Sequence, residues 1–408
     1  MSLDIRPIFS ALLRNRTGAV LVALQVAIAL AVLTNAVYIV HQRATMINRP
    51  TGIDDQNIFV IDSTGFGSRF NYEASLKDDL DYLRGLSGVV DASPVNHAPL
   101  SGGGSSTGLQ LQPHVRSSSD SHLLNYFEMD EHALHTFGVK LIAGRNFRPE
   151  EILPPFSPSN PHELVPQIIL TKKAADDLFP KQNALGKTVY DSEGHPTTVI
   201  GIIEDMLGTW PNIPQAPQLI GIFPRQPLMY GFYYLVRTRP GQRDAVMRTA
   251  EAHMATSNPD RVIRSVKPLT SIKRIVYLSD RNMAIFLATV TVLLVAITSL
   301  GIFGLATFNV STRTKQIGTR RAIGARRGDI IRYFMVENGL ITTTGVVLGC
   351  TLALGVGYWL SNQYGLPRLD LYYLTGGVLG LWTLGQFAVW QPARRASRVS
   401  PSVATRTV

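Results

Sequence analysis

Two short stretches look like catalytic or metal motifs, and each lacks a residue that the chemistry requires. LGKT (185–188) ends like a phosphate-binding loop, but the first glycine of G-x-x-x-x-G-K-[ST] would fall on Lys181. The residues that follow favour a strand, so no helix N-terminus would face a phosphate. His162 and Glu163 begin a zinc-protease motif, but its second histidine would fall on Pro166.

Other residues that could do chemistry are equally incomplete. His132 and His135 are three residues apart on an expected helix and could share a metal, but the sequence offers no third ligand, which favours a solvated pair. SGGGSSTG (101–108) could hold an oxyanion, although such a composition is typical of a mobile loop. There is no G-x-S-x-G, and the single cysteine, Cys350, lies in an apolar stretch. An enzyme is therefore not expected, and no cofactor or metal site is predicted.

Four apolar stretches organise the chain and predict transmembrane helices. They cover residues 17–40, 283–308, 334–360 and 371–390. Each is long enough to cross ~30 Å of hydrocarbon as a helix. The first is too long for the core of a cleaved signal peptide. Glu337 is the one formally charged residue in these four stretches.

Basic residues are concentrated in three short segments, which predicts the orientation in the membrane. Segments 1–18, 309–332 and 392–408 carry net charges of +2, +6 and +4, while the whole chain carries +10. The rest of the chain is therefore slightly acidic. The positive-inside rule places these segments in the cytoplasm and the long middle domain outside. This explains the basic balance without a nucleic-acid partner.

These features predict an α-helical membrane protein with four transmembrane helices and a large α/β (α+β) domain of two subdomains outside the cytoplasm. The expected order is as follows: cytoplasmic N-terminus 1–16, first span 17–40, outer domain 41–282, second span 283–308, cytoplasmic loop 309–333, third span 334–360, outer turn 361–370, fourth span 371–390 and cytoplasmic tail 391–408. The outer domain has no cysteine, so no disulfide supports it.

The outer domain alternates strand and helix patterns. Strands are expected at 57–62 and 89–95 with a helix at 74–86 between them, and strands at 232–238 and 261–266 with a helix near 241–256 between them. This predicts one porter-like subdomain from about 50–119 plus 229–268, and an inserted subdomain at about 120–228. Residues 268–282 are expected to form a stalk. Within the insertion, a strand is expected at 123–130, a strand and helix at 168–180, and a hairpin at 186–190 and 197–206.

Small residues at four-residue spacing predict close helix packing in the membrane. They are Ala23, Ala27 and Ala31 in the first span, Gly345 and Gly349 in the third, and Gly376 and Gly380 in the fourth. The spacing fits packing within the chain and a subunit interface equally well. Glu337, at the head of the third span, is expected to pair with a nearby arginine.

The segment STRTKQIGTRRAIGARRGDI (311–330) places six basic residues and one acid between two spans. The charges could simply hold the loop in the cytoplasm, or bind anionic lipid. A third interpretation is docking of a cytoplasmic protein, because isoleucine and alanine side chains alternate with the arginines. Gly318, Gly324 and Gly328 are expected to break the segment into short helical pieces.

This segment resembles the cytoplasmic loop of the MacB/FtsX-type ABC transporter permeases. Their pattern is approximately R-x-x-E-I-G-x-R-[KR]-A-[IL]-G-A, followed by an arginine-rich turn, D-I and a glutamate at a helix start. Gln316 stands where that family usually has Glu. The matching positions are Arg313, Ile317, Gly318, Arg320, Arg321, Ala322, Ile323, Gly324, Ala325, Asp329, Ile330 and Glu337.

The resemblance covers nearly the whole chain. FGVKLIAGRNF (137–147) and the strand patterns after it resemble the periplasmic core domain of those permeases, and QPARRASRVSPSVATR (391–406) resembles their C-terminal tail. The resemblance implies a multi-pass protein of the bacterial inner membrane, with a large periplasmic domain and both termini in the cytoplasm. It also implies that the loop residues above, with Gln316, contact an ATP-binding subunit.

The implied function is mechanical. A separate cytoplasmic ATP-binding subunit would bind ATP and Mg, and the permease, as a homodimer or heterodimer, would pass the motion to its periplasmic domain. The expected role is efflux with a periplasmic adaptor and an outer-membrane channel. Transmembrane signalling or activation of cell-wall hydrolases, and a structural membrane anchor, remain alternatives.

Overall fold

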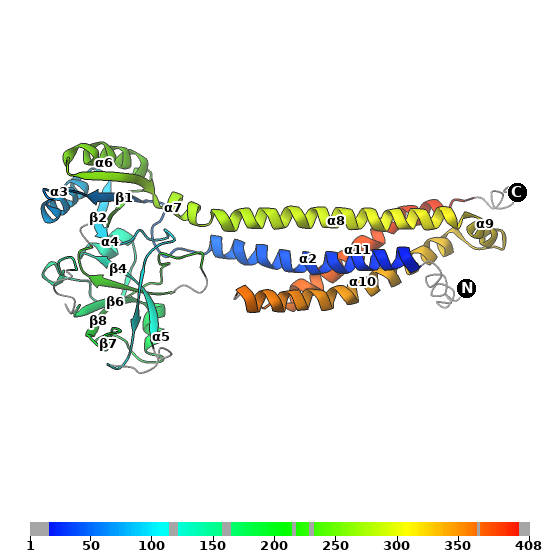
Figure 1. The fold of residues 1–408 in the computed structure, drawn as a ribbon, viewed down its shortest axis with the longest axis horizontal. Helices are drawn as coiled ribbons and strands as arrows, with labels where there is room; N and C mark the ends of the chain where they lie inside the picture. The colour runs from blue at the N-terminus through cyan, green and yellow to red at the C-terminus, as the bar shows by residue number, and fades with distance from the viewer. Residues whose placement is uncertain are drawn as a thin grey trace. The chain divides into compact units, whose positions relative to one another are not determined.

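The computed structural model describes residues 16–113, 121–156, 165–213, 218–227, 232–364 and 368–399 of the chain. They divide into two units, shown in Figure 1. The helical unit draws its described residues from 1–45 and 280–408, and the α/β unit comprises 46–279. Residues 1–15, 400–408, His162 and Glu163 lie outside the described residues.

Five described helices make up most of the helical unit. They are α2 (Arg16–Asn48), α8 (Leu278–Thr312), α9 (Thr314–Ala322), α10 (Arg327–Tyr364) and α11 (Leu371–Ala396). Among them, α2, α8 and α10 are long and apolar enough to cross a membrane. Each extends beyond its predicted apolar stretch, because hydropathy marks the part that leaves water and polar residues continue the helix at its ends.

The predicted fourth span, 371–390, is helical but does not add a fourth candidate span. With 26 residues, α11 is long enough, at about 39 Å for a rise of 1.5 Å per residue. Its hydropathy is lower because residues 371–390 include two tyrosines, two tryptophans, one glutamine and four glycines. The described residues therefore give three candidate spans, and the predicted count of four is not confirmed.

Helix α2 is the central element of the helical unit. Of its most apolar stretch, 56% is buried, against 11% for α8. Gln25 on α2 donates to the carbonyl of Ile297 on α8 at 3.0 Å. Near the other end of the same two helices, Arg43 pairs with Asp280 at 2.8 Å. These two polar contacts set the register of α8 on α2.

The first sheet of the α/β unit has the strand order β11-β1-β10-β2, with neighbouring strands antiparallel. Its strands are β1 (Ile58–Gly65), β2 (Val89–Val95), β10 (Phe232–Thr238) and β11 (Arg261–Pro268). The two predicted strand-helix-strand halves do form one sheet. Each half is split, because a strand of the other half lies between its own two strands, as in ferredoxin-like folds.

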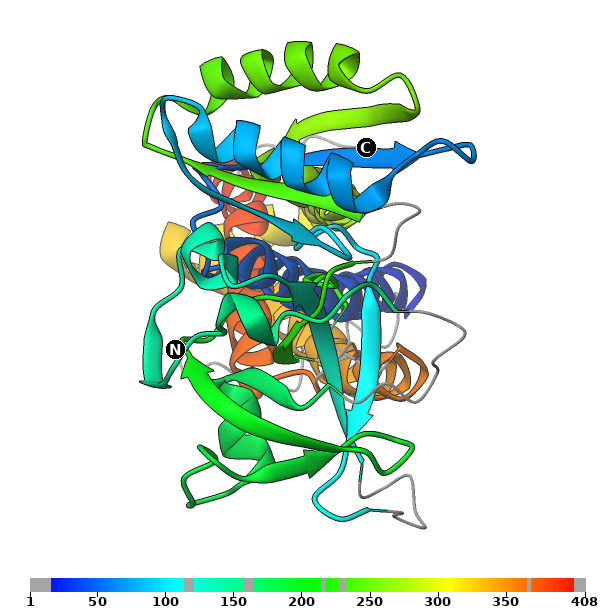
Figure 2. The same cartoon turned by 90° about the vertical axis from the view of Figure 1, so that its left-hand side faces the viewer.

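Two helices, α3 (Tyr72–Gly85) and α6 (Arg243–Ser257), cover one face of this sheet, as Figure 2 shows. Helix α3 begins where Asn71 accepts a hydrogen bond from the backbone amide of Ala74, a typical N-cap. Leucines at helical spacing on α3 then pack against Phe59 and Tyr234 of the sheet.

A buried polar network ties these helices to the sheet. Tyr234 donates to Asp79 of α3 at 2.6 Å, and Arg261 of β11 pairs with the same carboxylate. Arg261 also donates to the carbonyl of Met254 and the hydroxyl of Ser257 on α6. The side chain of Arg261, only 1% exposed, thus donates to three acceptors, and such contacts are the condition for burying a charge.

The second sheet of the α/β unit has the order β3-β4-β9-β6-β8-β5, with β7 paired to β8. Helices α4 (Ala133–Phe137) and α5 (Lys172–Leu178) and the 3-10 turn η2 (Pro149–Glu151) connect its strands. The predicted hairpin is formed by β7 and β8. The strands are β3 (Ser105–Leu109), β4 (His122–Met129), β5 (Leu141–Gly144), β6 (Gln167–Thr171), β7 (Thr188–Tyr190), β8 (Pro196–Ile203) and β9 (Leu219–Pro224).

The predicted loop at 101–108 is wrong in its second half, which forms β3. This strand pairs with β4, so the insertion begins soon after β2 rather than near residue 120. The sequence SSTGL carries one large apolar residue and gives almost no strand signal. Just before β3, a Cβ on Gly104 would lie 2.1 Å from the Thr209 hydroxyl, so the backbone here is closely packed.

One apolar core joins the two sheets, and the predicted stalk is attached to it. Val60 and Leu235 of the first sheet pack with Phe127 and Ile222 of the second. Residues 269–276 form α7 (Leu269–Val276), and Tyr277 follows it. The Tyr277 hydroxyl lies 3.3 Å from the Met46 carbonyl and 3.0 Å from that of Pro211. The chain therefore enters and leaves the α/β unit at one place.

The first prediction concerns Glu128 on β4. Burial raises its pKa to about 7, against the opposing effect of Arg225. A carboxyl with a raised folded-state pKa holds its proton more tightly when folded, so its contribution to stability falls as pH rises from about 4.5 to about 7. Because glutamine does not ionise, Glu128→Gln should reduce this fall in unfolding free energy by up to about 3 kcal/mol. The free energy can be measured near pH 5 and pH 8 by hydrogen exchange of the β4 amides, corrected for intrinsic rates. An unchanged pH dependence would contradict the assignment.

Candidate functional site

The basic segment between α8 and α10 folds into one short helix and one turn. Arg313 precedes α9, and Gly324 ends the turn with a φ of 104°, a left-handed conformation that favours glycine. The backbone amides of Ile323, Gly324 and Ala325 donate back to carbonyls of α9. The prediction that three glycines break the segment is therefore wrong for two of them. Gly318 lies buried inside α9, and Gly328 lies in the first turn of α10.

The inner face of α9 packs on α10. Ile317 is 5% exposed and belongs to the same apolar cluster as Ile330 and Phe334 of α10. Ala325, in the turn, packs against this cluster. Gly318 is the other buried residue of α9. Burial of this small face fixes how α9 is rotated.

An ion pair fixes the start of α9. Arg313 lies 3.0 Å from the Glu337 carboxylate and 3.4 Å from the Tyr333 hydroxyl. Glu337 is 3% exposed. The prediction that it pairs with an arginine is therefore confirmed, and the arginine is Arg313. Because a buried carboxylate without a counter-charge is costly, this contact holds α9 against α10.

A second arginine fixes the end of α9. Arg321 donates to the carbonyl of Ser397 at 3.1 Å and to that of Val399 at 2.9 Å. It therefore binds the segment that follows α11. Arg313 and Arg321 were predicted to contact a partner, but both are occupied within the chain. Sequence reasoning missed Tyr333, Ser397 and Val399, since nothing local marks a backbone carbonyl as an arginine acceptor.

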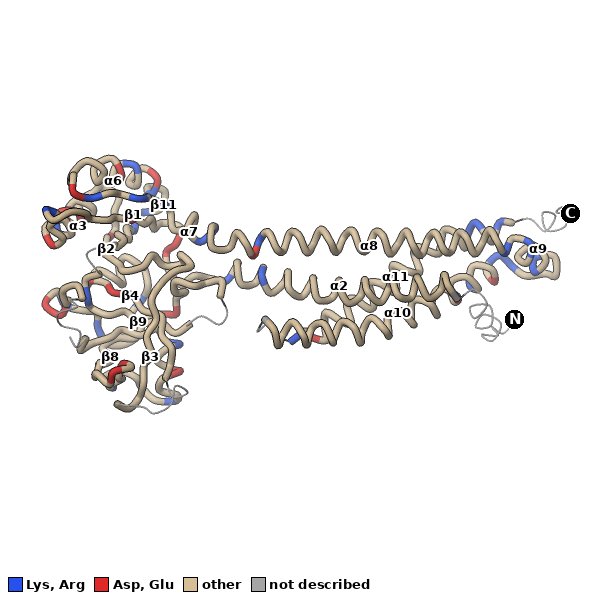
Figure 3. Tube along the Cα trace, viewed as in Figure 1, with Lys and Arg blue, Asp and Glu red and all other residues tan. Residues whose placement is uncertain are grey.

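The outer face of the segment is exposed and carries the remaining predicted residues. Gln316, Arg320 and Ala322 are exposed on α9, and the Arg320 guanidinium lies 4.8 Å from the centre of the Tyr333 ring. Ile323 is 83% exposed. Asp329 is also exposed and accepts a hydrogen bond from the amide of Arg326, which caps α10. Figure 3 shows the blue Lys and Arg positions gathered around α9.

The predicted small residues of α2 and α10 lie together. A Cβ on Gly345 would be 2.6 Å from the carbonyl oxygen of Ala23, and one on Gly349 would be 3.0 Å from that of Ala27. These glycines therefore let two helix backbones approach closely. Ala31 packs separately, with Ala353 of α10 and Leu374 of α11.

The predicted glycines of α11 face away from the described chain. A Cβ on Gly376 or Gly380 would meet no described atom within 4 Å. The contacting glycine is Gly377, where a Cβ would lie 2.5 Å from the Thr34 side chain of α2. Neighbouring positions on a helix point about 100° apart, so Gly377 contacts α2 while Gly376 and Gly380 lie on a face that meets no described neighbour.

The other candidate chemistry is not assembled in the described residues. His132 donates through Nδ1 to the Asp91 carboxylate at 2.8 Å, which raises the pKa of the imidazole, and His135 lies 3.6 Å from the same carboxylate. No group of three or more His, Cys, Asp or Glu suited to a metal occurs there. Lys187 of LGKT lies over the Phe179 ring, and the strand β7 follows it.

A glycine pair gives a matched test of the helix packing. Gly349→Leu should destabilise the protein by about 1–3 kcal/mol, because the side chain has no space against α2. Gly355→Leu, also on α10, has the same effect on helix propensity, but its side chain meets no described atom within 4 Å and should not destabilise the chain. Thermal unfolding of the two purified variants in detergent compares them. Equal losses would contradict this arrangement of α2 and α10.

The Arg313–Glu337 pair gives a second test. Arg313→Met should cost about 3–5 kcal/mol, because it leaves a buried carboxylate unpaired. Adding Glu337→Gln should recover part of that loss. Unfolding free energies of the two single variants and the double variant form the cycle. If the two single effects simply add, the pair does not hold α9 as described.

Comparisons with known proteins identify the family of the chain. The chain matches the MacB-like periplasmic core domain over residues 19–253 and the FtsX-like permease C-terminal domain over 288–401. It is 24% identical over 307 residues to the macrolide export ATP-binding/permease protein MacB of Burkholderia lata, over 72% of this chain and 44% of that protein. The protein of the same name from Neisseria meningitidis serogroup A is 23% identical over 86% of this chain and 52% of its own length.

The chain thus spans about half the length of the curated relatives that it matches. The crystal structure of the periplasmic region of MacB from Actinobacillus actinomycetemcomitans matches with 16% identity over 57% of this chain and 97% of that chain. Its TM-score of 0.33 is too low to support a conclusion about the fold. The match to the core domain alone covers more than half of the 408 residues, and the C-terminal match lies over the segment around α9. The chain therefore belongs to the MacB/FtsX family of ABC transporter permeases.

Proposed function

We propose that this permease couples ATP hydrolysis by an ATP-binding partner to a conformational change of its outer α/β unit, and that the partner docks on the outer face of α9. The observation that carries this proposal is Ile323. It is an apolar side chain, 83% exposed, at the end of a helix whose inner face is fixed by Ile317. ATP and Mg belong to the partner in this proposal, and the permease itself needs no cofactor.

The surroundings of Ile323 support a protein partner over a purely topological role. Arg320, Ala322 and Arg326 beside it are exposed, so an apolar centre has a basic rim. Interfaces are commonly built this way, with a buried apolar anchor inside a polar ring. Positive charge alone is enough to keep the segment in the cytoplasm, so that role does not explain an exposed apolar side chain such as Ile323.

The connection between α9 and the outer unit supports mechanical coupling. Helix α8 is continuous from Leu278 to Thr312, and α2 from Arg16 to Asn48, so each contains a boundary between the two units. A displacement of α9 would move the end of α8 next to it, and a continuous helix carries such a displacement along its length. No path for a substrate through the membrane is required.

In this proposal α11 is the fourth transmembrane helix, despite its lower hydropathy. Its 26 residues are long enough, and its last turn carries Arg394 and Arg395, which the positive-inside rule places in the cytoplasm. Both termini are then cytoplasmic and the α/β unit is periplasmic, with the permease in the inner membrane. Lipids would contact the exposed faces of α8 and α10.

A second permease subunit, identical or related, completes the membrane part in this proposal. The face of α11 around Gly376 and Gly380 has no described neighbour, and small residues at this spacing suit helix association. We further propose export with a periplasmic adaptor and an outer-membrane channel as the biological role, supported by relatives named for macrolide export. An ATP-dependent action on cell-wall enzymes without an adaptor is the alternative.

The docking proposal predicts a specific loss in Ile323→Ala. Burying an isoleucine contributes about 1.5–3 kcal/mol, so affinity for the ATP-binding partner should fall about tenfold or more. ATP turnover should no longer respond to the permease at limiting partner concentration. Binding and ATPase assays on the complex reconstituted in lipid measure both effects.

Ile323→Leu is the matched control and should retain binding, since it keeps an apolar side chain of similar size. Thermal stability should not change in either variant, because Ile323 contacts so little of its own chain. Arg321→Glu is unsuitable as a control since it also breaks the contact with Ser397. Wild-type affinity in Ile323→Ala would refute docking at this face. The charges of the segment would then serve only to hold it in the cytoplasm.

A further inference from the structure

We propose that an anionic phospholipid of the cytoplasmic leaflet binds in a groove between α10 and α11, with an acyl chain in the groove and its phosphate at Arg332 and Arg394. The inference rests on the proposed membrane location of α11, and it goes beyond the coupling role. The groove has a volume of about 270 Å³. It is lined by Met335 of α10 and by Trp382, Thr383, Gln386, Phe387 and Trp390 of α11.

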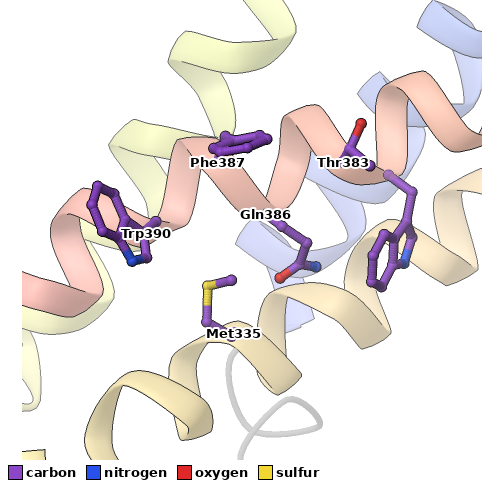
Figure 4. Close-up of a pocket in the computed structure, with 6 residues that line it drawn as sticks. Met335, Thr383, Gln386, Phe387 and Trp390 are labelled. Atoms are coloured by element: carbon purple, nitrogen blue, oxygen red, sulfur yellow. The ribbon is translucent and has the colours of Figure 1, made fainter. Parts of the chain in front are cut away.

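The shape of the groove suits one extended chain. Trp382 and Trp390 are eight residues apart on α11, so they bracket about 12 Å of helix. Figure 4 shows Met335 and Gln386 pointing toward each other from the two helices, with Trp390 beside them. The walls are mostly apolar, and Trp382, Phe387 and Trp390 are 42%, 77% and 49% exposed. A groove this open on the surface of a membrane helix takes its occupant from the side.

The groove has a basic end, which selects the headgroup. The Arg394 guanidinium lies 5.4 Å from the centre of the Trp390 ring, within the range of a cation–π contact. On α10, exposed Arg332 precedes Met335 by three residues, which places the two on one face of the helix. Tryptophan and arginine side chains in this order are typical of the boundary between hydrocarbon and headgroups.

The acidic residues near this end leave the arginines available to a phosphate. Between 326 and 340 the acids are Asp329 and Glu337. Asp329 accepts from the amide of Arg326, and Glu337 is paired with Arg313. A zwitterionic headgroup brings its own cation to the site, whereas an anionic phosphodiester does not. Charge complementarity therefore favours an anionic lipid over a neutral one.

The two tryptophans of the groove provide the test. In a Trp210→Phe/Trp359→Phe background, the remaining tryptophans are Trp382 and Trp390. Brominated phosphatidylglycerol and brominated phosphatidylcholine are added in turn to the full-length protein in unlabelled phosphatidylcholine vesicles. Brominated phosphatidylglycerol should quench the tryptophan fluorescence at a several-fold lower mole fraction than brominated phosphatidylcholine does. High salt should reduce this preference because it screens the charge of the headgroup.

Arg332→Gln and Arg394→Gln should each reduce the preference by about fivefold. Arg398→Gln is the matched control, because Arg398 is exposed at the same end of the helical unit but lies beyond α11. It should keep the preference.

Equal quenching by both lipids, or loss of preference in the control alone, would overturn the proposal. Absence of quenching by either lipid would also overturn it, because the groove would then be covered by protein, such as a second copy of the chain. The assay contains no nucleotide and no ATP-binding partner. Its failure leaves the docking proposal at Ile323 intact, and failure of that proposal leaves this one intact.

Discussion

The buried carboxylate of Glu337 is the constraint on which the arrangement of α9 and its neighbouring turns depends. A carboxylate at 3% exposure needs a counter-charge, and Arg313, the residue just before α9, supplies it at 3.0 Å. Once Arg313 is held there, α9 starts at a fixed place on α10. Ile317 then fixes the rotation of α9, and Arg321 fixes its end on the segment after α11. What remains free is the outer face that ends at Ile323.

The basic residues of the segment 311–330 therefore make different contacts, although they look alike in the sequence. Arg313 neutralises a buried acid, and Arg321 satisfies two backbone carbonyls. Arg320 lies over an aromatic ring and stays exposed. Arg332 of α10 and Arg394 of α11 lie outside this segment and are exposed, and we propose that they bind a lipid phosphate. Charges that look alike in the sequence thus differ in burial and in the groups that they contact.

Much of this fold could be predicted because its signals are local. Apolar stretches located the long helices, and leucine spacing located α3. The pairing of Glu337 with an arginine followed from the cost of an unpaired buried charge. The ordering of strands could not be read, because the insertion of β10 between β1 and β2 depends on contacts between residues far apart in sequence. The strand β3 was missed since SSTGL has almost no apolar alternation.

The errors in the candidate site have a common physical origin. Sequence spacing shows which residues share a helix face, but not which face meets a neighbour. The spacing placed Gly345 and Gly349 on one face of α10, which the structure packs on Ala23 and Ala27 of α2, whereas the face with Gly376 and Gly380 meets no described atom within 4 Å. In the same way, the loop motif could not separate the arginines bound within the chain from the exposed ones.

The most direct test of this account places a photo-crosslinking amino acid at position 323 in the full-length protein in native membranes. The account predicts a crosslink to a protein with a phosphate-binding loop. The same probe at Ile317, whose side chain packs in one cluster with Ile330 and Phe334 of α10, should give no such product. Crosslinks from position 323 only to lipid, or to no ATP-binding protein, would contradict the claim that α9 is a docking site.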